Sequence, residues 1–116
     1  MNVTIEHYSD GHIMRISCEN DEGELHNPNG PAFQQWDNNG QERRRVYKIN
    51  GKIHREDGPA MQWWDDKGRE TIREYRIDGE ELTEREFNNR KNTIEIMAEG
   101  KVTRISRESA KALNLL

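Results

Sequence analysis

The fold of this 116-residue chain is decided by residues 50–77, which read NGKIHREDGPAMQWWDDKGRETIREYRI. Residues 22–49, EGELHNPNGPAFQQWDNNGQERRRVYKI, match them at 13 positions with a constant offset of 28. A fixed period of this length is typical of repeat architectures, in which each unit buries its apolar face by pairing with its neighbour. The sequence therefore predicts tandem repeat units.

Each unit predicts a β-hairpin, because two strand-like runs flank a polar turn that ends in glycine. Gly40 and Gly68 stand where a positive φ is expected. The predicted fold class is mainly β with minor α, with tandem antiparallel hairpin repeats of period 28 in a single twisted sheet. The predicted strand pairs are 30–37 with 41–49 and 58–65 with 69–77, preceded by a hairpin over 3–17 around Asp10-Gly11.

The repeated side chains of these strands are two apart, which places them on one face of the sheet. We expect that face to be the shared core. Its members are Ala32, Gln34, Trp36, Tyr47 and Ile49, with Ala60, Gln62, Trp64, Tyr75 and Ile77 in the second copy. The opposite face differs between the copies, since Phe33, Gln35 and Val46 are replaced by Met61, Trp63 and Glu74.

A third unit starts at Gly79 and breaks off. Thr83, followed three residues later by Glu86, is a capping-box pattern, which predicts a short helix near residues 83–90. A hairpin around Glu99-Gly100 and a capped helix over 106–115 are expected after it. The predicted organisation is a single domain, 1–116, made of an N-terminal hairpin (1–21), two hairpin repeats (22–77), a truncated repeat with its helix (78–90), and a hairpin with a C-terminal helix (91–116).

Composition limits the functions that fit. With 31% apolar and 34% charged residues the chain can bury only a thin core, and a net charge of −4 gives no general attraction to nucleic acid. No run of about 18 apolar residues occurs, and the first residues do not resemble a signal peptide. We expect a soluble, cytoplasmic protein that binds neither nucleic acid directly nor a membrane, and whose one cysteine, Cys18, forms no internal disulfide.

The repeated histidines, His26 and His54, suggest either chemistry or architecture. His54 with Asp57 or Glu56 would suit a metal-dependent hydrolase, since imidazole is a common ligand and proton carrier. A zinc site needs three or four converging ligands, however, and the four histidines are spread over three predicted units, with only His7 and His12 in the same hairpin. We therefore predict no catalytic, cofactor-binding or metal-binding residue, and expect each histidine to fix the bend before Gly-Pro by a hydrogen bond.

The unrepeated face offers a candidate contact surface. Trp63 has no counterpart in the first copy, and an exposed Trp often anchors a protein interface; the alternative is that the C-terminal helix covers it. Acidic stretches elsewhere suggest mimicry of a nucleic acid backbone. The candidate partner-binding residues are Met61, Trp63, Arg76, Asp65, Asp66, Glu80 and Glu81.

Residues 50–60, NGKIHREDGPA, followed by EYRIDG at 74–79, resemble the short MORN-like hairpin repeats (G-x-x-H-R-x-D-G-P-A) of bacteriophage and giant-virus proteins. The first copy departs from that pattern at residues 27–29. The resemblance implies a viral, non-enzymatic binding protein in the host cytoplasm, whose partner is a host protein or complex. An inhibitor of a host defence such as CRISPR, or of another host enzyme, acting by occlusion or by acidic mimicry, is the expected role. A self-assembling repeat protein, including a homodimer, and a hydrolase using His54 are the alternatives.

Overall fold

The computed structural model describes residues 1–91, 93–98 and 100–114. The chain forms two compact units, Met1–Glu81 and Leu82–Leu116. A single domain over the whole length therefore remains a prediction. Among the described residues, no helix combines the length and the apolar character that a membrane crossing requires.

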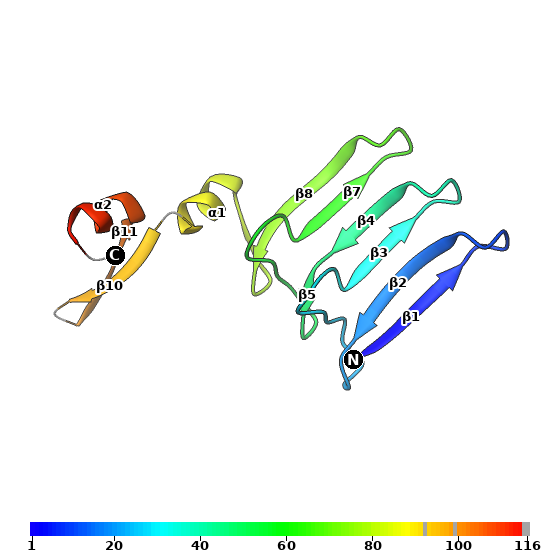
Figure 1. Cartoon of the computed structure of the whole chain (residues 1–116), viewed down its shortest axis with the longest axis horizontal. Coiled ribbons are helices and arrows are strands. Elements are labelled where there is room, and N and C mark those ends of the chain that lie inside the picture. The colour runs from blue at the N-terminus through cyan, green and yellow to red at the C-terminus, as the bar shows by residue number, and fades with distance from the viewer. Residues whose placement is uncertain (92, 99, 115–116) are drawn as a thin grey trace. The chain divides into compact units, whose positions relative to one another are not determined.

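The first unit is built on an antiparallel sheet of seven strands in the order β1-β2-β3-β4-β7-β8-β9 (Figure 1). A separate two-stranded ribbon, β5-β6, leads from one hairpin to the next. The prediction of a mainly β chain with antiparallel hairpins is confirmed. The strands are β1 (Asn2–His7), β2 (Ile13–Glu19), β3 (Phe33–Trp36), β4 (Glu42–Val46), β5 (Lys48–Ile49), β6 (Lys52–Ile53), β7 (Met61–Trp64), β8 (Glu70–Ile77) and β9 (Glu80–Leu82).

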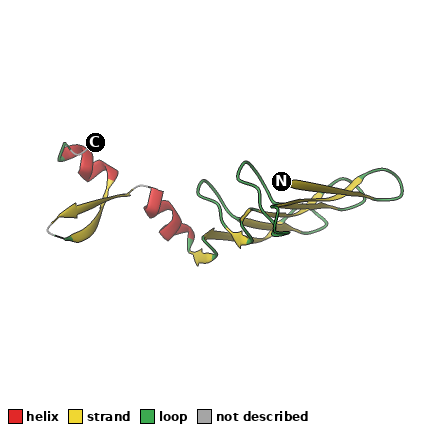
Figure 2. Cartoon of the chain, turned by 90° about the horizontal axis from the view of Figure 1, so that it is seen from below, coloured by secondary structure: helices red, strands yellow, loops and turns green. Residues whose placement is uncertain are grey.

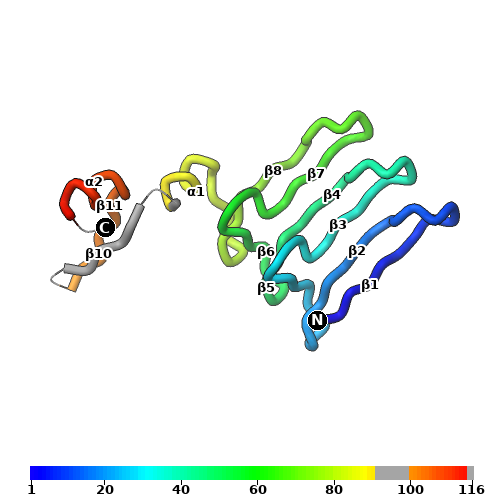
Figure 3. The backbone as a smooth tube through the Cα atoms, viewed as in Figure 1, coloured from blue at the N-terminus to red at the C-terminus, as the bar shows by residue number. Residues whose placement is uncertain are grey.

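Three hairpins of the sheet, β1-β2, β3-β4 and β7-β8, have the same connection. Residues 8–12, 37–41 and 65–69 join their strands, and Figure 3 shows these turns at the same end of the strands. Each hairpin also has a β-bulge next to its turn, which increases the local twist. The closing N–H···O bonds are Tyr8 to His12 (2.8 Å), Asp37 to Gln41 (2.9 Å) and Asp65 to Arg69 (2.9 Å).

Tight turns lie at the opposite end of the strands. Asn50 and Gly51, between β5 and β6, have φ of 46° and 80°, and Asp78 and Gly79, between β8 and β9, have 51° and 85°. Two successive positive φ values are typical of a type I′ turn, whose twist matches that of the flanking strands. Asn and Asp tolerate this region better than most residues do, which explains their place before glycine.

The first unit is a single-layered sheet, seen edge-on in Figure 2. Within this unit, the main contacts between elements are those between strands that are neighbours in a sheet. Because the first unit supplies no second layer of its own, the predicted core is too broad for this unit: Ala32, Ala60 and Tyr75 are buried, but Gln34, Trp36, Tyr47, Ile49, Gln62, Trp64 and Ile77 are only half-buried. Cys18 is the further buried residue of this unit.

The two faces of the sheet follow from the strand register. Residues directly opposite each other share a face, and neighbours in a strand alternate. Arg44 lies over the Trp63 ring (4.4 Å to its centroid) and Arg45 over the Trp64 ring (5.4 Å). We name the two sides the Trp63 face and the Trp64 face. The Trp63 face carries Phe33, Gln35, Arg44, Val46, Met61, Trp63, Ile72 and Glu74, and the Trp64 face carries Gln34, Trp36, Glu42, Arg45, Gln62, Trp64, Glu70 and Arg73.

The second unit begins with helix α1 (Glu84–Lys91). The Glu86 N–H donates to Thr83 Oγ1 at 3.1 Å, and the Thr83 N–H donates to Glu86 Oε1 at 3.0 Å. This reciprocal pair is the predicted capping box, which satisfies two N–H groups at the start of the helix. The bond from the Thr83 backbone N–H is the main reason why the pKa of Glu86 lies below its usual value.

A hairpin of β10 (Thr93–Ala98) and β11 (Lys101–Ser106) follows, as predicted. Glu99 of the expected turn lies outside the described residues. Helix α2 (Arg107–Ala112) is capped by Ser106, whose Oγ accepts the Ser109 N–H at 3.0 Å. The helix ends before the predicted residue 115 because Asn114 has a φ of 60°, and the Asn114 N–H turns back to the Lys111 carbonyl.

Candidate functional site

The Trp63 face brings two apolar members of the predicted contact set onto one strand, β7. Met61 lies opposite Val46 and Glu74, and Trp63 lies opposite Arg44 and Ile72. All of these side chains except that of Arg44 are half-buried. The register therefore places an aromatic and aliphatic patch, continued by Phe33 opposite Val46, across four neighbouring strands.

Arg44 gives this patch its charge. Its guanidinium stacks on the Trp63 ring at 4.4 Å, and the residue is exposed. A cation–π contact at an exposed site contributes roughly 0.5–1 kcal/mol, which favours this position of the arginine side chain. Beside the pair lies an open hollow of about 420 Å³, lined in part by Tyr8, Gln35 and Trp63. The patch therefore has an aromatic centre, a positive charge stacked on it and a depression lined by both residues.

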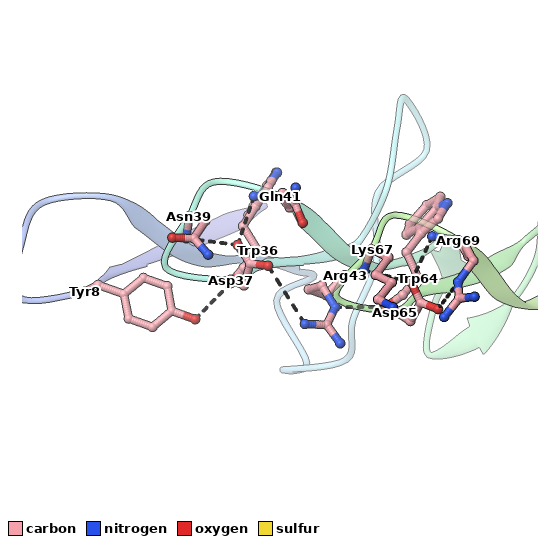
Figure 4. Close-up of polar contacts among 10 residues, drawn as sticks. All are labelled: Tyr8, Trp36, Asp37, Asn39, Gln41, Arg43, Trp64, Asp65, Lys67 and Arg69. Atoms are coloured by element: carbon pink, nitrogen blue, oxygen red, sulfur yellow. Dashed lines mark hydrogen bonds and ion pairs between the residues drawn. The ribbon is translucent and has the colours of Figure 1, made fainter.

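Contacts between neighbouring hairpins frame the hollow at the turn end of the strands (Figure 4). Tyr8 Oη donates to the Trp36 carbonyl at 2.9 Å, joining the first hairpin to the second. Arg43 Nε donates to the Trp64 carbonyl at 2.8 Å, joining the second hairpin to the third. Arg43 is the first of three consecutive arginines, residues 43–45. Its spacing gave no signal of this role, because the acceptor is a backbone carbonyl 21 residues away.

Asp65 and Asp66, two predicted contact residues, belong to the turn after β7. Asp65 Oδ1 accepts the N–H groups of Lys67 and Arg69, at 2.9 Å each, and Asp65 Oδ2 pairs with Arg69 Nε at 2.8 Å. These bonds, foremost the one from the Arg69 backbone, lower the pKa of Asp65 below its usual value. Asp37 accepts the same two backbone bonds in the preceding turn. Asp65 therefore shapes its turn, whereas Asp66 is exposed.

Arg76, Glu80 and Glu81 lie at the other end of β8. Arg76 Nη2 pairs with Glu74 Oε1 at 2.7 Å and with Glu81 Oε2 at 3.4 Å, and Arg76 Nη1 donates to the Gly79 carbonyl at 2.9 Å. Arg76 is thereby held to its own β8-β9 turn. The predicted residues thus form separate groups: Met61 and Trp63 on the face, Asp65 and Asp66 at the turn, and Arg76 with Glu80 and Glu81 at the far end.

The repeated histidines bind backbone. His26 Nδ1 accepts the Asn50 N–H, and His54 Nδ1 accepts the Asp78 N–H, both at 2.9 Å. Each acceptor therefore holds the first residue of the next type I′ turn, not the bend before Gly-Pro as predicted. Asp57 pairs with Arg55 Nε at 3.0 Å. Within the described ranges, no group of three or more His, Cys, Asp or Glu side chains is placed to hold a metal ion.

Several carboxylates of the first unit are paired with arginines, and all of these pairs except Asp57 with Arg55 lie within one hairpin. The two opposite charges of such a pair largely cancel at distances greater than their separation, so the pair presents little net charge to a partner. A surface that imitates nucleic acid needs a run of uncompensated negative charge. The pairs are Glu6 with Arg15, Glu42 with Arg45, Asp57 with Arg55, Asp65 with Arg69, Glu70 with Arg73, and Glu74 with Arg76.

Comparisons of this chain with protein-family models, with curated proteins and with solved structures gave no match.

Proposed function

We propose that this chain is a protein-binding module that engages its partner through the Trp63 face. The observation that carries the proposal is the Arg44–Trp63 stack at the centre of a half-buried apolar patch. Trp and Arg are the side chains most often found to dominate binding energy, and they act from the middle of an interface. Here the centre is aromatic and aliphatic, while the charged Glu74 and Arg76 lie toward one end, as in the core and rim of an interface.

Occlusion fits this surface better than acidic mimicry. On the Trp63 face the Glu74 carboxylate is paired with Arg76 and Arg44 adds a positive charge, so this face presents little uncompensated negative charge. A binder of this kind acts by covering a site on its partner. The viral origin, and a host defence or metabolic enzyme as the target, rest on the resemblance of residues 50–60 to phage repeats, and we include both in the proposal.

The repeat architecture belongs to the same proposal. Residues 22–49 and 50–77 share their turn, bulge and histidine contacts, and we propose that β1-β2 is a third, diverged copy because its turn and bulge are the same. Tandem hairpins lengthen a sheet without adding a second layer. This explains how a short chain presents a broad face with a thin core.

The test is affinity capture from a bacterial host lysate with the tagged chain and two variants, read by mass spectrometry. Trp63→Ala removes the aromatic centre, and Arg73→Ala, an exposed position on the Trp64 face, is the matched control. We expect a stoichiometric partner that Arg73→Ala retains and Trp63→Ala loses, with both variants folded by circular dichroism. Equal capture by Trp63→Ala, or no partner with the unmodified chain, would overturn the proposal.

A further inference from the structure

The outer edge of β1 differs from the other end of the sheet. β1 and β9 are the terminal strands in the sheet order. β9 is three residues long and carries Glu80 and Glu81, two features that discourage pairing with another chain. β1 (Asn2–His7) is twice as long and exposed at every residue.

β1 lacks the usual protection of an edge strand. Its sequence, NVTIEH, contains no proline and no lysine, and its bulge lies on the β2 side of the pair. Its single carboxylate, Glu6, is bound by Arg15 through two parallel bonds, Nε to Oε1 at 2.9 Å and Nη2 to Oε2 at 3.0 Å. The charge that would repel a second strand is thus neutralised within the hairpin.

The side chains of β1 complement a reversed copy of the same strand. When Thr4 meets Thr4 of a second copy, Val3 meets Ile5, and Asn2 meets Glu6. Val3 and Ile5 are 54% and 48% exposed, so this register covers apolar surface that is open in one chain. In this register odd-numbered residues pair with odd-numbered ones and even with even, so the backbone groups that point away from β2 in one copy face those of the other copy. No like charges lie opposite each other.

We propose that two copies of this chain pair through β1, antiparallel and about a two-fold axis at Thr4. The axis is normal to the sheet, so the Trp63 faces of both copies lie on the same side of one continuous sheet. The short, acidic β9 ends the sheet at each outer edge, and the assembly closes at two chains. The pairing is independent of the Trp63 contact proposed above.

The test is sedimentation velocity of the full chain over a range of concentrations. Thr4→Lys sets two ammonium groups opposite each other at the axis, which is unfavourable in a cross-strand pair. We expect it to raise the dimer dissociation constant at least about tenfold, equivalent to about 1.4 kcal/mol. Thr103→Lys, the same change at an exposed position of β11, is the matched control and should leave the dimer intact.

A second variant tests the register directly. Thr4→Cys brings two thiols together at the axis, near the separation that a disulfide requires, so mild oxidation should yield a covalent dimer, whereas Thr103→Cys should not. The native Cys18 is buried. A monomer at every concentration, equal dimerisation of both Lys variants, equal cross-linking of both Cys variants, or an open series of larger species would each overturn the proposal. Trp63→Ala should dimerise normally, which separates this result from the partner test.

Discussion

Replacing His54 with alanine tests whether the repeated histidines are structural. The change removes Nδ1, which accepts the Asp78 N–H at 2.9 Å, and an imidazole that is 18% exposed. Asp78 begins the type I′ turn that leads into β9, with a φ of 51°. The free energy of unfolding should therefore fall. The local destabilisation should be greatest at the β8-β9 turn.

The magnitude follows from the geometry. A hydrogen bond between neutral groups contributes about 0.5–1.5 kcal/mol net, and water can partly replace this one because Asp78 is exposed. Adding the lost packing of a mostly covered ring gives about 1–2 kcal/mol. For a unit the size of Met1–Glu81, each kcal/mol shifts Tm by about 4–8 °C, so we expect a decrease of roughly 5–15 °C.

The assay is urea and thermal unfolding of four proteins: the unmodified chain, His54→Ala, His54→Asn and His12→Ala. Asparagine places an acceptor oxygen near the position of Nδ1 and should recover part of the loss. His12 forms only an exposed pair with Asp10, at 57% and 52% exposure, and its replacement should cost less than about 0.5 kcal/mol. If His54→Ala kept full stability and instead abolished a metal-dependent hydrolysis by the unmodified chain, the structural role would be refuted.

Two further predictions concern capping and pH. Thr83→Ala removes the hydroxyl acceptor of the capping box and should cost α1 about 1 kcal/mol, seen as faster amide exchange at Glu86; unchanged exchange would contradict the assignment. The lowered pKa of Asp65 means that its contribution to stability is complete above the unfolded value, about 3.9, and is lost as the pH falls through the lower folded value. The urea concentration at the unfolding midpoint should therefore decrease as the pH is lowered below about 4, and it should decrease less steeply in Asp65→Asn. Identical pH profiles of the two proteins would rule this contribution out.

Local signals in the sequence predicted the elements well. The turn glycines, the alternation on either side of them and the Thr83–Glu86 pair each act within a few residues, and the structure has the corresponding hairpins and helix start. The predicted separation of Trp63 from Trp64 rests on strand geometry alone and is also confirmed. Such features depend on φ preferences and on side-chain period, which a single sequence contains.

The sequence did not predict the side-chain contacts that join neighbouring hairpins and turns, because one partner in each contact is a backbone group. Tyr8 binds the Trp36 carbonyl, and His54 binds an N–H that lies 24 residues later. Any residue can offer such a group, so no residue type marks the partner. The extent of the core was overestimated for a related reason: alternation in a strand marks a face, but it does not say whether a second layer will cover that face.

The two faces of the sheet differ in how closely the second copy repeats the first. On the Trp64 face the second copy repeats the first: Gln34 and Arg45 both bind Glu42, and Gln62 and Arg73 both bind Glu70. The Gln34–Glu42 and Gln62–Glu70 bonds cross between strands, and the Arg–Glu bonds lie within one strand. Each glutamate accepts from two donors, so replacing Glu42 or Glu70 removes both bonds of its copy.

The Trp63 face is under no such constraint. Its contacts include the Arg44–Trp63 cation–π contact and the Glu74–Arg76 ion pair, and the two copies differ there, with Gln35 replaced by Trp63 and Val46 by Glu74. These positions are half-exposed, and substitutions away from a packed core usually change stability little. A hairpin unit can therefore be duplicated with its ladder intact while its other side changes. This is why we place the binding surface on the face where the repeats disagree.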